Sequence, residues 1–148
     1  MATNPLIAQG TLNKVRCSII IPANPSLNIT ASYMSKSMAT VSLEGDISHL
    51  IPTGTGGVYS PEPFVMVSIT AHLLRTQALT NSWRQQFEAT ANIGDIAVHS
   101  DTSAFPSYHF RSGVIQHFNQ GSYDGEDPTA MLVMMAIYDV NSDMWNFQ

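Results

Sequence analysis

Residues 64–74 read FVMVSITAHLL, and this stretch decides the fold class. Every second residue from Val65 to Leu73 is apolar. The positions between them are mostly polar, as at Thr70 and His72. An alternation with a period of two is typical of a β-strand that has one buried face. We therefore predict a strand over residues 64–74.

Stretches of the same kind lie on both sides of it. The residues from Ala130 to Val140 are apolar on both faces near their centre, as in a strand between two packed layers. Other stretches are rich in β-branched residues or alternate as residues 64–74 do. We predict a mainly β, antiparallel sandwich or barrel-like domain of six or seven strands that covers residues 1–148. The predicted strands are residues 11–21, 27–33, 39–43, 64–74, 93–98, 108–119 and 130–140.

One helix is expected, over residues 77–91. Leu79, Trp83 and Phe87 recur there at four-residue spacing, which places them on one helix face. Such a stripe belongs to a core more often than to a ligand site. We therefore expect a single α-helix that flanks the sheet.

The composition is poor in charge. Only 11% of the residues are charged, against about 25% in a typical soluble domain. Surface that neighbours will cover has less need of charge than the surface of a free monomer. The low charge therefore favours a self-assembling protein, although a neutral surface without further meaning is the alternative. A net charge of −5 argues against a protein that grips nucleic acid.

The few charges are unevenly placed along the chain. Residues 1–43 contain Lys14, Arg16 and Lys36 and no acid, whereas residues 112–148 contain five acids and no base. This polarity would suit head-to-tail contacts between copies, or it is chance in a small sample.

Residues 45–63 hold four Gly and three Pro and are expected to form a long loop. Apolar side chains such as Leu50 and Tyr59 on such a loop imply that something covers them. Residues 1–10 are nearly uncharged and indicate an extended arm. Residues 141–148 form a C-terminal tail with aromatic side chains that need a partner surface.

Catalytic patterns are not found in the sequence, and no enzyme, metal site or cofactor is predicted. The five histidines form no zinc-binding pattern, and the single cysteine, Cys17, forms no intrachain disulfide. An enzyme would need a His–acid pair that converges only in the folded chain. No apolar run is long enough to cross a membrane, so no membrane anchoring is expected.

Several motifs resemble the tail tube proteins of contractile-tailed bacteriophages. The similarity runs over most of the chain, and its motifs are structural rather than catalytic. Other virion ring proteins share this fold. The segments that carry the resemblance are NPLIAQGTLN (4–13), LIPT (50–53), SPEPF (60–64), VSIT (67–70) and LLRTQ (73–77).

The resemblance implies a structural role in the virion tail, after assembly in the host cytoplasm. Six subunits would form a ring, and rings would stack into a tube inside a contractile sheath. Inner strands would join between subunits into one barrel around a channel. The implied partners are other copies of the chain, the tail sheath, baseplate and tail terminator proteins. The tape measure protein and genomic DNA would occupy the lumen without sequence-specific binding.

Two sets of site residues follow from this picture. Exposed apolar side chains of the long loop and the tail are the candidates for ring stacking. Small polar side chains on the strands at 27–33 and 39–43 are the candidates for the lumen. The stacking candidates are Ile47, Leu50, Ile51, Val58, Tyr59, Trp145 and Phe147, and the lumen candidates are Asn28, Thr30, Ser32, Thr40 and Ser42.

Two alternatives stay open. One is a tail terminator or baseplate tube-initiator protein, which forms a ring without polymerising. The other is a small β-barrel that binds an apolar ligand, with its eight methionines and the long loop as an adaptable lining.

Overall fold

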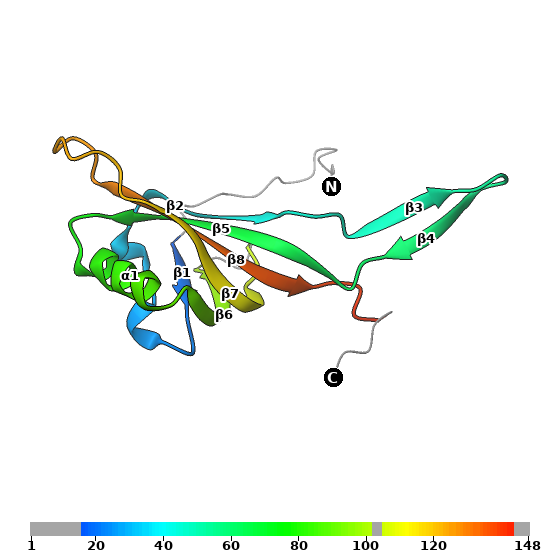
Figure 1. The fold of residues 1–148 in the computed structure, drawn as a ribbon, viewed down its shortest axis with the longest axis horizontal. Coiled ribbons are helices and arrows are strands. Elements are labelled where there is room, and N and C mark those ends of the chain that lie inside the picture. The colour runs from blue at the N-terminus through cyan, green and yellow to red at the C-terminus, as the bar shows by residue number, and fades with distance from the viewer. Residues whose placement is uncertain (1–15, 102–104, 144–148) are drawn as a thin grey trace, which may run out of the picture.

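A computed structural model describes residues 16–101 and 105–143, which are built around a six-stranded antiparallel sheet (Figure 1). The sheet has the strand order β1-β6-β7-β8-β5-β2 and nearly closes into a barrel. Its strands are β1 (Cys17–Ile20), β2 (Met34–Leu43), β5 (Phe64–Leu74), β6 (Asn92–Ser100), β7 (Tyr108–Asn119) and β8 (Thr129–Asp139). A separate hairpin consists of β3 (Ser48–Pro52) and β4 (Gly57–Pro61). The predicted mainly β fold with one helix is confirmed.

The most extensive strand pair of the sheet is β5 with β8. The two strands pair along their whole length, from Phe64 opposite Asp139 to Leu74 opposite Thr129. The apolar positions of β5 are buried on one face, as the alternation in its sequence predicts. Burial of one such side chain contributes about 1.5–3 kcal/mol, so this pair anchors the core.

The helix α1 (Ala78–Ala89) lies against one face of the sheet (Figure 1). Trp83 is fully buried and Leu79 almost so, while the Phe87 ring packs on Phe118 of β7 at 5.3 Å between centroids. The four-residue stripe is therefore core. The helix lies inside the predicted range 77–91 and leaves the opposite face of β2, β5 and β8 open.

The strand predicted over residues 27–33 is absent. Two 3-10 turns, η1 (Pro25–Leu27) and η2 (Ala31–Tyr33), take its place, joined to β1 by one bridge between Ile29 and Ile19. Asn28 Oδ1 accepts a hydrogen bond from the Ile21 N–H at 2.8 Å. Side chains that bond nearby backbone favour turns over strands. The apolar alternation nevertheless predicts burial correctly for Leu27 and Ile29.

Strand β2 is longer than predicted and carries a bulge. Residues 35–37, which lie between the predicted strands 27–33 and 39–43, are part of it and fall between the pairs Met34–Leu73 and Ala39–Ala71. Met38 has a φ of 52°, a left-handed conformation that is rare for a residue of this type. The bulge bends β2 where it forms one edge of the sheet.

Candidate assembly surfaces

The β3–β4 hairpin projects beyond the body of the molecule (Figure 1). Sequence reasoning expected a loop over residues 45–63, and the structure forms two strands there instead. Five residue pairs connect them, from Ser48–Pro61 to Pro52–Gly57. The Thr53 N–H closes the tip by donating to the Gly56 carbonyl at 2.7 Å.

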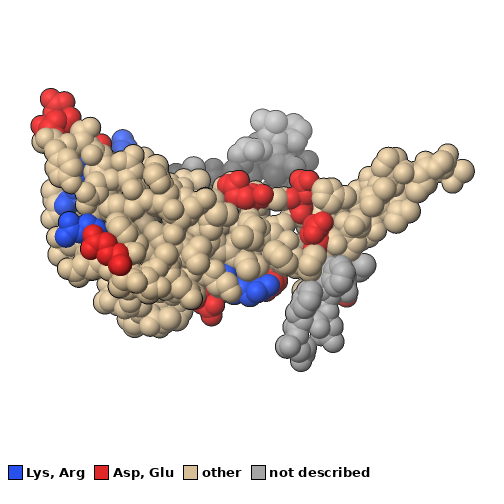
Figure 2. All heavy atoms as spheres, in the orientation of Figure 1, with Lys and Arg blue, Asp and Glu red and all other residues tan. Residues whose placement is uncertain are grey.

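Both faces of the hairpin are apolar. Leu50 lies opposite Tyr59 on one face, and on the other Ile51 lies opposite Val58. Residues 47–61 contain no Asp, Glu, Lys or Arg, and Figure 2 shows the hairpin as uncharged surface beyond acids at its base. A two-stranded hairpin is at best marginally stable alone in water, so this one needs covering surface. The exposed fractions are 49% for Ile47, 74% for Leu50, 51% for Ile51, 55% for Val58 and 53% for Tyr59.

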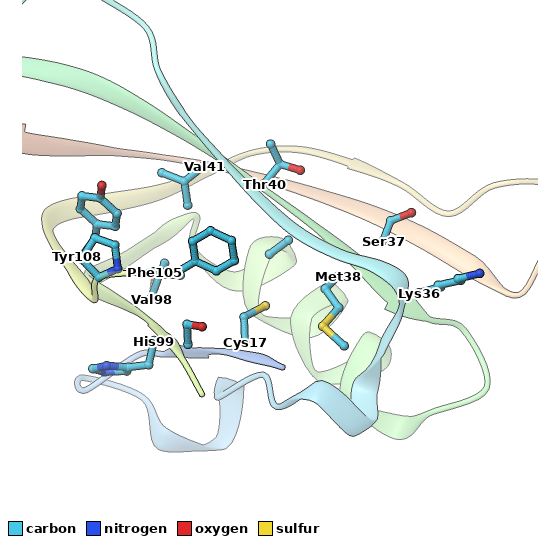
Figure 3. A pocket seen from close by; sticks show the side chains of 13 residues that line it. Cys17, Lys36, Ser37, Met38, Thr40, Val41, Val98, His99, Phe105 and Tyr108 are labelled. Carbon is cyan, nitrogen blue, oxygen red and sulfur yellow. The ribbon is translucent and has the colours of Figure 1, made fainter. Parts of the chain in front are cut away.

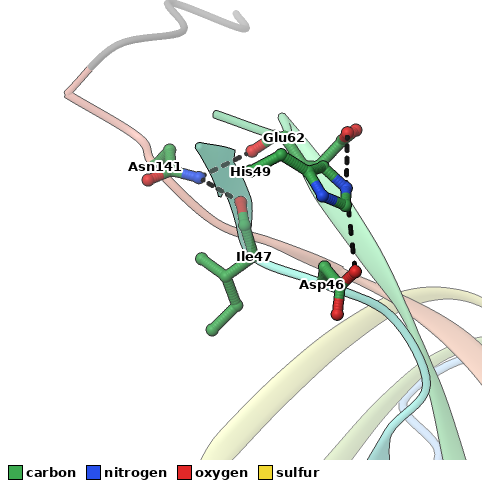
Figure 4. A network of polar contacts seen from close by, with 5 residues as sticks. All are labelled: Asp46, Ile47, His49, Glu62 and Asn141. Atoms are coloured by element: carbon green, nitrogen blue, oxygen red, sulfur yellow. Dashed lines mark hydrogen bonds and ion pairs between the residues drawn. The ribbon is translucent and has the colours of Figure 1, made fainter. Parts of the chain in front are cut away.

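Asn141 fixes the base of the hairpin to the end of β8 (Figure 4). Its Nδ2 donates to the carbonyl oxygens of Ile47 at 3.0 Å and Glu62 at 2.8 Å. Its Oδ1 accepts a hydrogen bond from the Tyr59 hydroxyl at 3.3 Å. Asn141 has a φ of 54°, which Asn tolerates better than most residues. The hairpin is thus held at a defined angle to the sheet.

Replacing Asn141 by Ala should loosen the hairpin without unfolding the subunit. Each lost hydrogen bond is worth about 0.5–1.5 kcal/mol, and Ala is less favourable than Asn at a positive φ. We expect amide hydrogen exchange within residues 48–61 to rise about tenfold or more, measured by mass spectrometry. Asn141→Gly is the control, because Gly accepts the φ but lacks the amide group. Wild-type exchange in Asn141→Gly would contradict the assigned role of the side chain.

Three acids surround the hairpin base and are called here the acidic collar: Glu44, Asp46 and Glu62. His49 lies between two of them, with Nε2 3.7 Å from Asp46 Oδ2 and 3.8 Å from Glu62 Oε1 (Figure 4). These side chains lie beside a shallow hollow that is also lined by Phe64 and Met66. The uncharged hairpin therefore rises from a negatively charged base.

The open face of the sheet carries a patch of hydroxyl groups. Thr40 lies opposite Thr70, and Ser42 lies opposite Ser68. Across the next strand pair, Val133 and Met135 of β8 continue the same face beside Thr70 and Ser68. The face thus changes from hydroxyl to apolar between β5 and β8, in agreement with the two apolar faces that the sequence indicates for residues 130–140.

The five lumen candidates do not share one surface. Thr40 and Ser42 lie on the open face of the sheet, whereas Asn28, Thr30 and Ser32 lie in and between the turns η1 and η2. Thr30 and Ser32 line a hollow beside β1 instead. The expected face shared by two adjoining strands is wrong, because residues 27–33 form no strand of the sheet.

Most cations of the described residues pair within the chain. Arg16 pairs with Asp101, Arg84 with Glu88 and Arg111 with Asp139. Arg75 donates hydrogen bonds to the carbonyl oxygens of Ser122 and Asp127 in the β7–β8 loop. In the described part of the chain, Lys36 is the cation that forms none of these contacts.

Asp127 of the β7–β8 loop forms hydrogen bonds with a residue close to it in the chain. Asp127 accepts hydrogen bonds from the Thr129 hydroxyl at 2.6 Å and the Thr129 N–H at 3.0 Å. These bonds lower the pKa of the Asp127 carboxyl.

Within residues 16–101 and 105–143, no group of three or more His, Cys, Asp and Glu side chains is arranged to hold a metal ion. No helix in these ranges is long and apolar enough to span a membrane.

A cavity of about 510 Å³ opens at the seam where the sheet fails to close, and we call it the seam cavity. One wall is the bulged edge of β2, from Lys36 to Val41. The other wall is Cys17 of β1 with residues 98–100 of β6, and Phe105 and Tyr108 cover one side. Figure 3 shows the side chains of Met38 and Phe105 on either side of the space next to Cys17. The Cys17 sulfur lies 3.9 Å from that of Met34, and burial raises the pKa of its thiol.

No protein-family model matches the chain, and no curated protein matches its sequence. Evidence for a function therefore comes from the surfaces of the molecule. The sequence identified five apolar residues of the hairpin and its base but not Asn141 or the seam cavity. The two remaining stacking candidates, Trp145 and Phe147, lie outside the described residues, as does the arm at 1–10.

Proposed function

We propose that the chain is the subunit of a tube, the inner tail tube of a contractile-tailed virion. Hexameric rings would stack inside the sheath and form the conduit for DNA ejection. The observation that carries this proposal is the β3–β4 hairpin. The hairpin is exposed and apolar on both faces, and Asn141 holds its base through two hydrogen bonds. An exposed apolar surface of this kind is unfavourable for a free monomer and suited to burial between subunits.

The asymmetry of the subunit supports an open-ended assembly. The hairpin projects from one end of the body, so a copy that binds it through a different surface meets it head to tail. A head-to-tail contact repeats without self-complementarity and propagates as a helix unless it closes into a ring. Stacked rings of one polarity are such an assembly.

The lumen would be lined by the open face of the sheet. Its hydroxyl groups at Thr40, Ser42, Ser68 and Thr70 bind water without charge, and a net charge of −5 disfavours phosphate binding. DNA and the tape measure protein would pass such a surface without sequence-specific contacts. β1 and β2 are the edge strands of the described sheet, and contacts with neighbouring subunits would cover their free edges, which removes an aggregation hazard.

Negative-stain electron microscopy of the concentrated protein tests the proposal. We expect hollow tubes of uniform diameter that lengthen with protein concentration. Isolated rings under all conditions would favour a tail terminator or tube-initiator role instead. A protein that stays monomeric at high concentration would contradict assembly altogether. In tubes solved by cryo-electron microscopy, Thr40 and Ser42 on the outer wall would reject the assigned lumen face.

One observation favours a second candidate, a β-barrel that binds an apolar ligand. The seam cavity has a volume in the range of small-molecule sites and is lined by sulfur and aromatic groups. A monomer that takes up a fluorescent apolar probe, with loss of binding in Met38→Asp, would support it. Tubes that exclude the probe would reject it.

A further inference from the structure

We infer that the seam cavity is the socket that receives apolar side chains of the β3–β4 hairpin of a subunit in the next ring. This inference rests on the proposed tube and names the receiving side of its stacking contact. The two surfaces match in chemistry. The hairpin offers apolar side chains on both faces, and the cavity offers Met38, Val41, Phe105 and Tyr108 as an apolar lining.

A subunit cannot place its own hairpin in its seam cavity. The cavity borders β2 from Lys36 to Val41, and the chain then runs on from Leu43 toward the hairpin, away from the cavity. Asn141 holds the hairpin base at two carbonyl groups, so the hairpin does not fold back. A hairpin that reaches the cavity would therefore be that of another copy.

The free edge of β2 borders the cavity. The stretch of β2 that lines it, Lys36–Val41, contains the bulge at Met38 and is therefore shorter than a fully extended strand of the same residues. The outer edge of β2 also lacks a neighbouring strand in the described sheet, so backbone groups are available along the socket.

Charge sets the direction of the contact. If two copies point the same way, a hairpin lying along β2 of the next copy brings its base to Lys36 and its tip to Val41. The acidic collar of one copy then meets Lys36 of the other. Lys36 is exposed and pairs with no acid among the described residues of its own chain, so it is free to do so. The attraction between the acidic collar and Lys36 favours this orientation of the hairpin over the reverse one.

Disulfide trapping tests the socket, because the chain has one native cysteine, Cys17, and it lines the cavity. Leu50→Cys and Val58→Cys place a second thiol on opposite faces of the hairpin. Assembled protein is oxidised with copper phenanthroline at about pH 9, since the thiolate is the reacting species and burial raises the pKa of Cys17. At least one variant should give a ladder of linked subunits that extends beyond six on non-reducing gels.

The controls separate the socket from other contacts. Adding Cys17→Ser to each variant should reduce the ladder to dimers at most. Tyr123→Cys, on an exposed loop far along the chain from the hairpin, should give no ladder with Cys17. A ladder that stops at six would place the hairpin within its own ring and overturn the inference. Tubes without any Cys17-dependent ladder would overturn the socket and leave the tube intact, whereas absence of assembly would overturn both.

Discussion

Replacing residues 48–61 by a two-residue Asn-Gly turn should give a stable subunit that no longer forms tubes. The two residues that flank the replaced segment are already adjacent, because the Glu62 N–H donates a hydrogen bond to the Ile47 carbonyl at 3.0 Å. The hairpin contributes no residue to the buried core cluster. We therefore expect the melting temperature to change by only a few degrees, measured by circular dichroism, while sedimentation and electron microscopy show complete loss of tubes.

A pair of point substitutions tests the same surface more gently. Leu50→Asp puts a charge on the most exposed apolar side chain of the hairpin and should abolish assembly, since a buried unpaired charge costs several kcal/mol. Tyr123→Asp changes a side chain that is 85% exposed on the β7–β8 loop and should leave assembly unchanged. Tubes formed by the hairpinless protein would show that stacking uses another surface.

The sequence predicted those parts of the fold in which the pattern of burial and the local backbone agree. Residues 64–74 alternate and form β5 with the predicted bounds, and the four-residue stripe at Trp83 forms the buried face of α1. At residues 27–33 the alternation predicts burial but not conformation. Hydrogen bonds such as the one that Asn28 accepts from Ile21 make turns there instead.

The hairpin shows a different limit of prediction from the sequence. Its glycines and prolines are typical of a loop, and strand pairing between residues 48–52 and 57–61 leaves no distinct local signal among them. Asn141 could not be identified at all. Its partners Ile47 and Glu62 lie 94 and 79 residues away in the chain, and only the folded sheet brings them together. The seam cavity likewise depends on where β1 and β2 end in space.

Replacing Trp83 by Ala should have the largest effect on stability. Trp83 is fully buried against the sheet, and truncation of a buried Trp costs about 3–5 kcal/mol. For a domain of this size we expect the melting temperature to fall by roughly 10–20 °C. Arg84→Ala, at the exposed neighbouring position, should change it by only a few degrees.

Trp83→Phe separates packing from polarity. The Trp83 Nε1–H is buried and has no hydrogen-bond partner among the described residues, so its removal relieves a cost while part of the ring contact remains. We expect Phe to lose less than half as much stability as Ala. An equal loss would mean that the indole N–H has an unseen role. Well below its melting temperature, Trp83→Ala should still form tubes, because its hairpin and seam are unchanged. The hairpinless protein should stay unassembled at every temperature, so the two variants separate the residues that fold the subunit from those that join it to its neighbours.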